Sequence, residues 1–224
     1  MCSSHMWERN KNCHRFRSAG LIMFFLLLST YFVCCSGTSD KPYIEEISIF
    51  PDPYLELAVQ RALGVDYPED IELEELNNLR KLDARGMGIT NISGLENLQN
   101  LKYLYLSENE IDEIAPISSL TNLRYLYLSG NKIEDISSIK HLKGLRVLFL
   151  RDNQIKDIRP ISELENIGVI YLRNNLISDI SPLVENNSLT EVWIWLEGNP
   201  LSEISISRDI PILRKRDVEV SYSP

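Results

Sequence analysis

The sequence predicts an α/β fold: a right-handed solenoid with a parallel concave β-sheet, a 3₁₀ or irregular convex side and a helical N-terminal cap. Three observations predict it. A phrase of 22 residues recurs without gaps from Leu79 to Ser188, each copy opens with a strand-like alternation of apolar residues, and an amphipathic segment precedes the first copy. A fixed period of this length is typical of stacked coils that bury their apolar faces only against one another.

The phrase begins five times, at Leu79, Leu101, Leu123, Leu145 and Ile167. Its general form, LxxLxLxxNxIxxIxxIxxL, is that of a leucine-rich repeat. Positions 4 and 6 alternate as one face of a short strand, so we expect them to point into the solenoid. Apolar residues three apart on the return path, as in Ile111, Ile114 and Ile117, have the period of a 3₁₀ turn.

Position 9 is asparagine in four copies. Its amide can donate and accept at once, which would satisfy main-chain groups of neighbouring coils. Met87 takes this position in the first copy, as expected of an end coil. Aspartates before three return turns are expected to cap free amides there. The asparagines are Asn109, Asn131, Asn153 and Asn175, and the aspartates are Asp135, Asp157 and Asp179.

The start of the chain predicts export. Four basic residues between Arg9 and Arg17 precede an apolar run at residues 21–33. This run is shorter than the roughly 20 residues of a spanning helix, which disfavours a permanent transmembrane anchor. Because the run ends at a cysteine pair, it resembles a bacterial lipoprotein signal, and Cys35 and Cys34 are the lipidation candidates. The residues before them match that signal poorly, so ordinary cleavage near residues 35–37 stays open.

The predicted domains are a signal peptide of lipoprotein type at residues 1–35, a tether at 36–43, a helical N-terminal cap at 44–78, leucine-rich repeats at 79–205 and a C-terminal cap at 206–224. In the N-terminal cap, Asp52 is expected to cap a helix that Gly64 ends. Its apolar positions are Leu55, Ala58, Val59, Ala62 and Leu63.

Three further elements are expected outside the regular repeats. A short helix at about residues 72–78 turns Leu73 and Leu76 inward. A two-residue insertion near residues 185–189 keeps Trp193 and Trp195 on the outer face, because an even shift preserves strand alternation. A helix at 207–215 and a strand at 217–222 close the stack.

The run IFPDPYLELAVQRALG followed by repeats of the form LxLxxNxIxDIxPLxxL resembles the cap and repeat domain of bacterial internalins. The resemblance covers roughly residues 49–205. It implies a curved solenoid on a bacterial surface whose concave sheet binds another protein, often a host receptor. The sequence shows no immunoglobulin-like domain after the repeats and no cell-wall sorting motif, so we expect a shorter relative that is lipid-anchored or secreted.

The composition and net charge of the chain limit the kinds of partner that it is expected to bind. The chain has 44% apolar and 25% charged residues, as folded proteins do, and a net charge of −9 that becomes −12 without the leader. Such a charge repels nucleic acid and anionic membranes. We therefore expect a monomer that binds no nucleic acid and meets a membrane only through a lipid anchor.

Catalysis is not expected. His141 is the one histidine after the leader, no cysteine follows Cys35, and no GxSxG, HExxH or phosphate-loop motif occurs. No cofactor or metal is predicted. Acidic residues on the return side, such as Asp112, Glu113 and Glu134, indicate a solvated face more than a calcium site.

The outward positions 3, 5 and 7 form the predicted partner-binding face, and aromatic and arginine side chains there are typical of binding hot spots. A purely structural ladder is the alternative, because aromatic residues favour strands. If the rings contact mainly solvent or partner, a Tyr105, Tyr127 and Tyr171 to serine variant should keep its melting temperature. The predicted face comprises Tyr103, Tyr105, Tyr125, Tyr127, Phe149, Arg151, Tyr171, Arg173, Trp193 and Trp195.

The predicted function is an exported, non-enzymatic protein that binds a protein partner through this face. It would be lipid-anchored at the cell surface or in the outer membrane or periplasm. The alternative is a glycan- or peptidoglycan-binding envelope protein, although the neighbours of the rings are mainly Arg, Ser and Val rather than the amides and carboxylates that bind sugar hydroxyls. A cytosolic phosphatase regulator with a similar repeat is disfavoured by the export signal.

Overall fold

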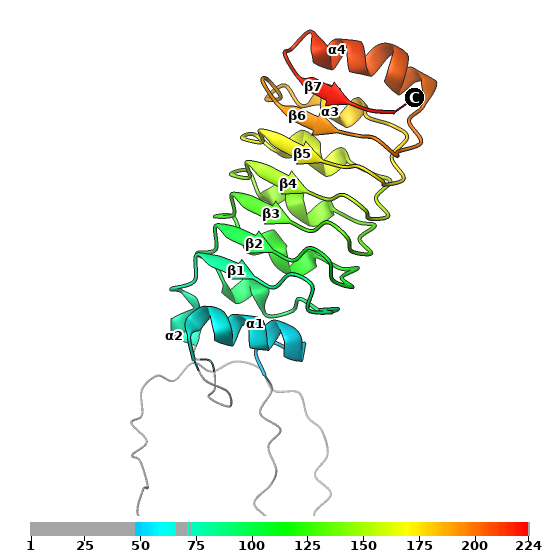
Figure 1. Ribbon diagram of the computed structural model, residues 1–224. Helices are drawn as coiled ribbons and strands as arrows, with labels where there is room; N and C mark the ends of the chain where they lie inside the picture. Colours follow the sequence, from blue (N-terminus) through cyan, green and yellow to red (C-terminus); the bar gives the residue numbers. More distant parts are fainter. Residues whose placement is uncertain (1–47, 66–70, 72, 224) are drawn as a thin grey trace, which may run out of the picture. The chain divides into compact units, whose positions relative to one another are not determined.

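The computed structural model describes residues 48–65, 71 and 73–223. Seven parallel strands form one sheet in which each strand pairs with the next along the sequence (Figure 1). Equivalent residues of successive copies face each other, as Leu104 faces Leu126, so the repeat period is also the register of the sheet. The strands are β1 (Lys81–Asp83), β2 (Tyr103–Tyr105), β3 (Tyr125–Tyr127), β4 (Val147–Phe149), β5 (Val169–Tyr171), β6 (Trp193–Trp195) and β7 (Glu219–Ser221).

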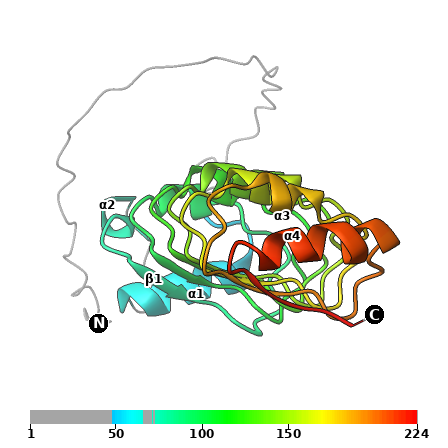
Figure 2. The same ribbon diagram turned by 90° about the horizontal axis from the view of Figure 1, so that it is seen from above.

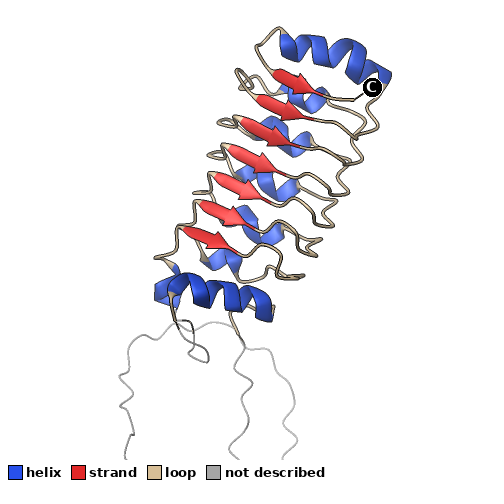
Figure 3. Ribbon diagram, in the orientation of Figure 1, coloured by secondary structure: helices blue, strands red, loops and turns tan. Residues whose placement is uncertain are grey.

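Short helical turns form the opposite side of the stack. Seen from above, the strands lie along one side and the turns along the other (Figure 2), and Figure 3 shows the same alternation along the stack. The leucines and isoleucines of positions 4 and 6 and of the return path fill the space between and are buried. The predicted solenoid is therefore confirmed. The turns are η1 (Leu95–Asn97), η2 (Ala115–Ser119), η3 (Ser137–His141), η4 (Arg159–Glu163) and α3 (Ser181–Glu185).

The asparagine column joins neighbouring coils as expected. The Asn131 side-chain amide donates to the carbonyl oxygens of Leu106 at 3.0 Å and Leu128 at 2.9 Å. Its oxygen accepts from the backbone N–H of Ile111 at 3.0 Å. Asn109, Asn153, Asn175 and Asn199 repeat this pattern. Each buried amide thus bonds main-chain groups of two coils, and a carbonyl such as Leu128 O accepts from the asparagines of two successive coils.

The N-terminal cap begins with helix α1 (Pro53–Leu63), which the left-handed Gly64 ends. One carboxylate oxygen of Asp52 accepts from the N–H groups of Tyr54 at 3.0 Å and Leu55 at 3.2 Å, as the sequence predicts. The other oxygen accepts from Thr90 N at 2.9 Å and from Asn91 N at 3.2 Å in the first coil. Asp52 therefore caps the helix and also fastens it to the repeats.

Two details of the predicted cap are wrong. Ala62 is exposed, and Gln60 is buried in its place. Helix α2 is a single turn, Leu73–Leu76, in which Leu76 is buried but Leu73 is 58% exposed. Only one of the two leucines therefore faces the core.

The predicted two-residue insertion lies on the return side of its coil and leaves the strand pairing intact. Ile170 faces Ile194 across the sheet, two residues beyond the regular period, and Trp193 and Trp195 stay on the outer face. The return turn of this coil is the α-helix α3, and Asn186 after it donates to Ile161 O at 2.9 Å and Leu164 O at 2.8 Å. The insertion near residues 185–189 is confirmed.

The stack closes with helix and strand, as expected. A π-helical segment, η5 (Ser205–Asp209), runs into α4 (Ile210–Arg214), so the helical stretch begins before residue 207. Strand β7 then pairs with β6. Residues 45–224 make up one compact unit. Within its described part, no helix has the length and apolar character needed to cross a membrane.

The expected signal peptide, tether and lipidation candidates Cys34 and Cys35 lie outside the described residues. These expectations, and the domain boundaries drawn from the sequence, stay predictions.

Candidate partner-binding face

The outer face of the sheet consists of three side-chain columns, at repeat positions 3, 5 and 7. In β2, Tyr103 and Tyr105 point outward and Leu104 is buried between them, and the other repeat strands alternate in the same way. The structure thus places the ten predicted residues on one face. We call the position 5 residues Tyr105, Tyr127, Phe149, Tyr171 and Trp195 the aromatic column.

The rings of the aromatic column are stacked on one another without interruption. Successive ring centroids are 4.6, 4.8, 4.1 and 4.0 Å apart from Tyr105 to Trp195. The spacing follows from the strand separation of about 4.8 Å. Each internal ring is therefore covered on both faces by its neighbours, and the column presents mainly ring edges and phenol hydroxyls.

This stacking corrects one expectation from the sequence. The tyrosines of the column were expected to contact mainly solvent or a partner, but they are half-buried against one another. Burial, with smaller contributions from Tyr105 and Tyr125, raises the pKa of Tyr127 above its ordinary value. The raised pKa reflects the partial burial of this ring within the column.

The position 3 column is less continuous. Tyr103 and Tyr125 stack at 4.7 Å, Val147 and Val169 follow, and Trp193 ends the column. Trp193 lies 6.0 Å from Trp195 and is 54% exposed, and Tyr103 is 36% exposed. These two side chains are the large apolar groups of this face that lie most open to a partner.

Charged side chains close the aromatic column at its N-terminal end, which the sequence did not indicate. Lys81 and Arg85 lie over the ring of Tyr105 at 5.2 and 5.3 Å from its centroid. Arg85 also pairs with Asp83 at 2.7 Å, and this hydrogen bond lowers the pKa of the Asp83 carboxyl. The sequence signal for this contact is a lysine or arginine at repeat position 3 or 7 in the coil next to one with an aromatic residue at position 5.

The two predicted arginines of position 7 are not free cations. Arg151 pairs with Asp152 at 2.6 Å, and Arg173 with Glu197 at 3.3 Å. Burial would raise the pKa of Asp152, but hydrogen bonds from Asn174 and Arg151 outweigh it, so the pKa lies below its ordinary value. The arginines thus act as parts of a polar network along the rim of the face.

A shallow hollow of about 340 Å³ lies beside this network. The hydroxyl of Ser129 is buried there and has no hydrogen-bond partner among the described residues. An unpartnered buried hydroxyl costs free energy, which a bound polar group would recover. The hollow is lined by Ser107, Glu108, Ser129, Phe149, Arg151, Tyr171 and Arg173.

Position 8 turns the chain away from the sheet through a left-handed residue in every coil. Gly86, Gly130 and Gly198 occupy it in three coils, and Glu108, Asp152 and Asn174 in the others, with φ of 52 to 59°. Left-handed backbone costs a residue with a Cβ about 1–2 kcal/mol. A Cβ at Gly130 would lie 2.8 Å from the Glu108 carboxylate. Glycine at this position therefore leaves room for the Glu108 side chain of the preceding coil.

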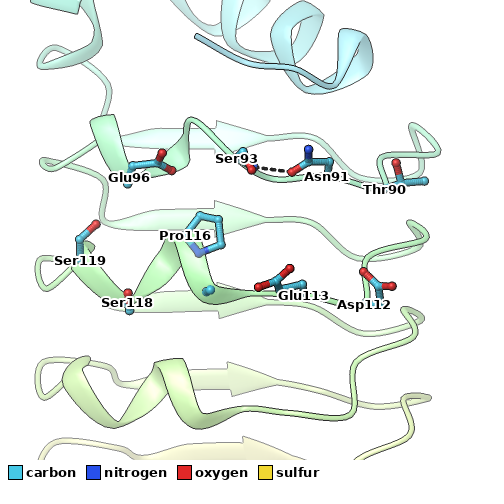
Figure 4. A pocket seen from close by; sticks show the side chains of 10 residues that line it. Thr90, Asn91, Ser93, Glu96, Asp112, Glu113, Pro116, Ser118 and Ser119 are labelled. Carbon is cyan, nitrogen blue, oxygen red and sulfur yellow. Dashed lines mark hydrogen bonds between the residues drawn. The ribbon is translucent and has the colours of Figure 1, made fainter. Parts of the chain in front are cut away.

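A second hollow, of about 430 Å³, lies on the return side between the first two coils. Figure 4 shows its polar lining, including Glu96, Asp112 and Glu113 and the hydrogen bond from Ser93 N to the Asn91 side chain at 2.9 Å. No group of three or more His, Cys, Asp or Glu within residues 48–65, 71 and 73–223 is placed to hold a metal ion.

The repeat pattern, the parallel sheet and the asparagine column define the class: the chain is a leucine-rich-repeat protein. The family model described as Leucine Rich repeats (2 copies) matches it at residues 77–119, 99–141, 121–166 and 143–185. A leucine-rich-repeat protein of Leptospira interrogans is similar in structure, with a TM-score of 0.60 and 27% identity over 68% of this chain. The chain spans 39% of that protein.

Two internalins of Listeria monocytogenes are also similar in structure. Internalin C2 is 27% identical, with a TM-score of 0.48 over 78% of this chain and 95% of its own. InlF is 26% identical, with a TM-score of 0.47 over 79% of this chain and 65% of its own. No curated protein sequence matches the chain significantly.

Proposed function

We propose that this protein is exported, is held at the bacterial surface or in the envelope by a lipid anchor, and binds a protein partner through the outer face of its sheet. The observation that carries the proposal is the aromatic column together with Trp193. A stack of five rings is rigid, so its edges and hydroxyls are held ready for contact at little cost in conformational entropy. Large aromatic side chains on such a surface are typical binding hot spots.

The geometry favours a protein over a glycan. A sugar ring stacks on an open aromatic face, but the faces of Tyr127, Phe149 and Tyr171 are covered by neighbouring rings at 4.0 to 4.8 Å. Edges and phenol hydroxyls suit the mixed apolar and polar surface of a protein. The exposed Trp193 is the ring best placed to offer a face to either kind of ligand.

The location and the anchor rest on the sequence, because the leader and the lipidation candidates Cys34 and Cys35 precede the described residues. The basic start, the apolar run and the cysteine pair support export with lipid attachment. Metabolic labelling of cells with a radioactive fatty acid tests this part separately. Label that enters the wild-type protein but not a Cys34→Ala/Cys35→Ala variant supports the anchor, and equal labelling of both contradicts it.

The binding test uses the purified chain and cultured epithelial cells with and without trypsin treatment. The variant is Tyr103→Ser/Trp193→Ser, which removes the two most exposed rings of the outer sheet face and leaves the aromatic column intact. Its matched control is Leu176→Ser/Ile204→Ser, which removes exposed apolar side chains away from the outer sheet face (45% and 58% exposed).

Binding that trypsin and the ring variant both abolish, while the control variant still binds, is the expected result. Binding that survives trypsin would favour a glycan or lipid ligand and overturn the proposal for host cells. If the chain does not bind the cells, the same pair of variants is tested on the bacterium's own envelope proteins. Equal binding of both variants there would contradict the proposed face.

A further inference from the structure

A row of positive charge runs along the edge of the partner-binding face where the strands begin. Repeat position 2 is basic in four consecutive coils, and the next two coils carry Gly168 and Val192 instead. Position 2 directly precedes the position 3 column in every coil, so the row borders Lys81 in the first coil and Tyr103, Tyr125 and Val147 in the next three. We call this set the basic row: it consists of Arg80, Lys102, Arg124 and Arg146.

The main chain holds the basic row at a fixed spacing. The carbonyl oxygen of Arg80 accepts from Lys102 N at 2.8 Å and from Tyr103 N at 3.1 Å. The carbonyls of Lys102, Arg124 and Arg146 each accept two N–H groups of the following coil in the same way. Successive charges are thus anchored one strand separation apart, about 4.8 Å.

No side chain of the basic row forms an ion pair with any residue in the part of the chain that the structure describes. Arg80 and Arg124 donate to backbone carbonyls near their own strand starts, at Asn77 and Leu123. Lys102 and Arg146 are exposed. In contrast, the position 7 arginines Arg85, Arg151 and Arg173 are all paired with carboxylates.

This row stands out because the chain as a whole is acidic, with a net charge of −9. Four like charges at this spacing repel one another, and no carboxylate among the described residues lies within ion-pair distance of them. A partner that brings carboxylates would relieve this repulsion, which is the complementarity that guides association between proteins.

We propose that the basic row binds an acidic segment of the protein partner, while the neighbouring position 3 column receives apolar side chains of the same segment. The inference rests on the proposed protein-binding function. A helix with acidic residues alternately three and four apart carries a carboxylate about every 5 Å along its length. This spacing matches the basic row, so a helix lying along the stack would set its acidic stripe on the row and its adjacent apolar stripe on Tyr103, Tyr125 and Val147.

The surroundings favour such a segment over a polyanion. The row ends after four coils, and Tyr103, Tyr125 and Val147 flank it on the strand side in three of them, while Lys81 does so in the first. A nucleic acid or a sulfated glycan would extend its charge beyond the row over a chain whose net charge is negative. A short acidic stripe with an apolar neighbour satisfies both columns at once.

The test uses a helical probe peptide with Glu at positions i, i+3, i+7 and i+10 and Leu on the adjacent stripe, together with a peptide in which Gln replaces each Glu. The chain variant is Lys102→Gln/Arg146→Gln. Its matched control, Lys140→Gln/Lys156→Gln, removes the same charge from exposed lysines away from the row. Association rates and affinities are measured at low and high salt.

We expect the Glu peptide to bind the wild type and the control variant with similar association rates that fall with salt. We expect the row variant to bind about tenfold more slowly and with weaker salt dependence. Equal binding of the Gln peptide, or equal losses in both variants, would overturn the inference, as would heparin or single-stranded RNA binding the wild type more tightly than the Glu peptide. In the cell assay, loss in the Tyr103/Trp193 variant without loss in the row variant would refute the basic row alone and leave the proposed function standing.

Discussion

Phe149 lies at the centre of the aromatic column, and its ring contacts Tyr127 at 4.8 Å and Tyr171 at 4.1 Å. Phe149→Leu keeps an apolar side chain but removes both ring contacts. Aromatic pairs contribute roughly 0.5–1.5 kcal/mol each beyond area burial. Two lost pairs therefore lower the free energy of unfolding by about 2 kcal/mol, which for a domain of this size lowers Tm by about 4–8 °C.

The assay is thermal unfolding followed by circular dichroism, with urea unfolding as a second measurement. Phe149→Tyr is the matched control, since it retains both contacts and adds the hydroxyl that other members of the column carry. We expect the control to unfold close to the wild type. If Phe149→Leu and Phe149→Tyr unfold at the same temperature, the rings do not stabilise one another and the reasoning from stacking is refuted.

The remaining predictions concern the asparagine column, the left-handed turn and the cap. Asn153→Ala leaves the Ile133 N–H without its partner, while the carbonyls of Leu128 and Leu150 each keep one donor, from Asn131 and Asn175, so it should cost about 2 kcal/mol in urea unfolding; a loss below about 1 kcal/mol would contradict this reasoning. Glu108→Gly should raise stability by about 0.5–1 kcal/mol and Glu108→Ala should not, because only glycine relieves the positive φ. Asp52→Ala should cost about 2 kcal/mol at neutral pH. Burial opposes ionisation of Asp52, but four backbone N–H donors lower its pKa below the ordinary 3.8. Its stabilisation is thus complete above that value and is lost as pH falls through the folded pKa, so a gap between wild type and variant that stays constant in acid would refute the linkage.

Much of the fold follows from the sequence because a repeat makes each coil a copy of its neighbour. The alternation at positions 4 and 6, the asparagine column and the cap at Asp52 are local patterns whose partners recur at a fixed distance along the chain. The two-residue insertion could also be located from the sequence. Asn199 continues the asparagine column only if two residues are inserted before β6. The errors at Leu73 and Ala62 fall in the cap, where no repeat constrains which side of a helix faces the core.

The sequence by itself determined the class of protein, the coil period and the side chains that share the outer face, because strand alternation alone decides these. Only the tertiary structure decided how those side chains meet. It stacks the rings of Tyr105 to Trp195 face to face, pairs Arg151 and Arg173 with carboxylates, and carries the second oxygen of Asp52 to the first coil. The orientation of a ring and the partner of a charge depend on side-chain positions across coils, and one-dimensional spacing does not contain them.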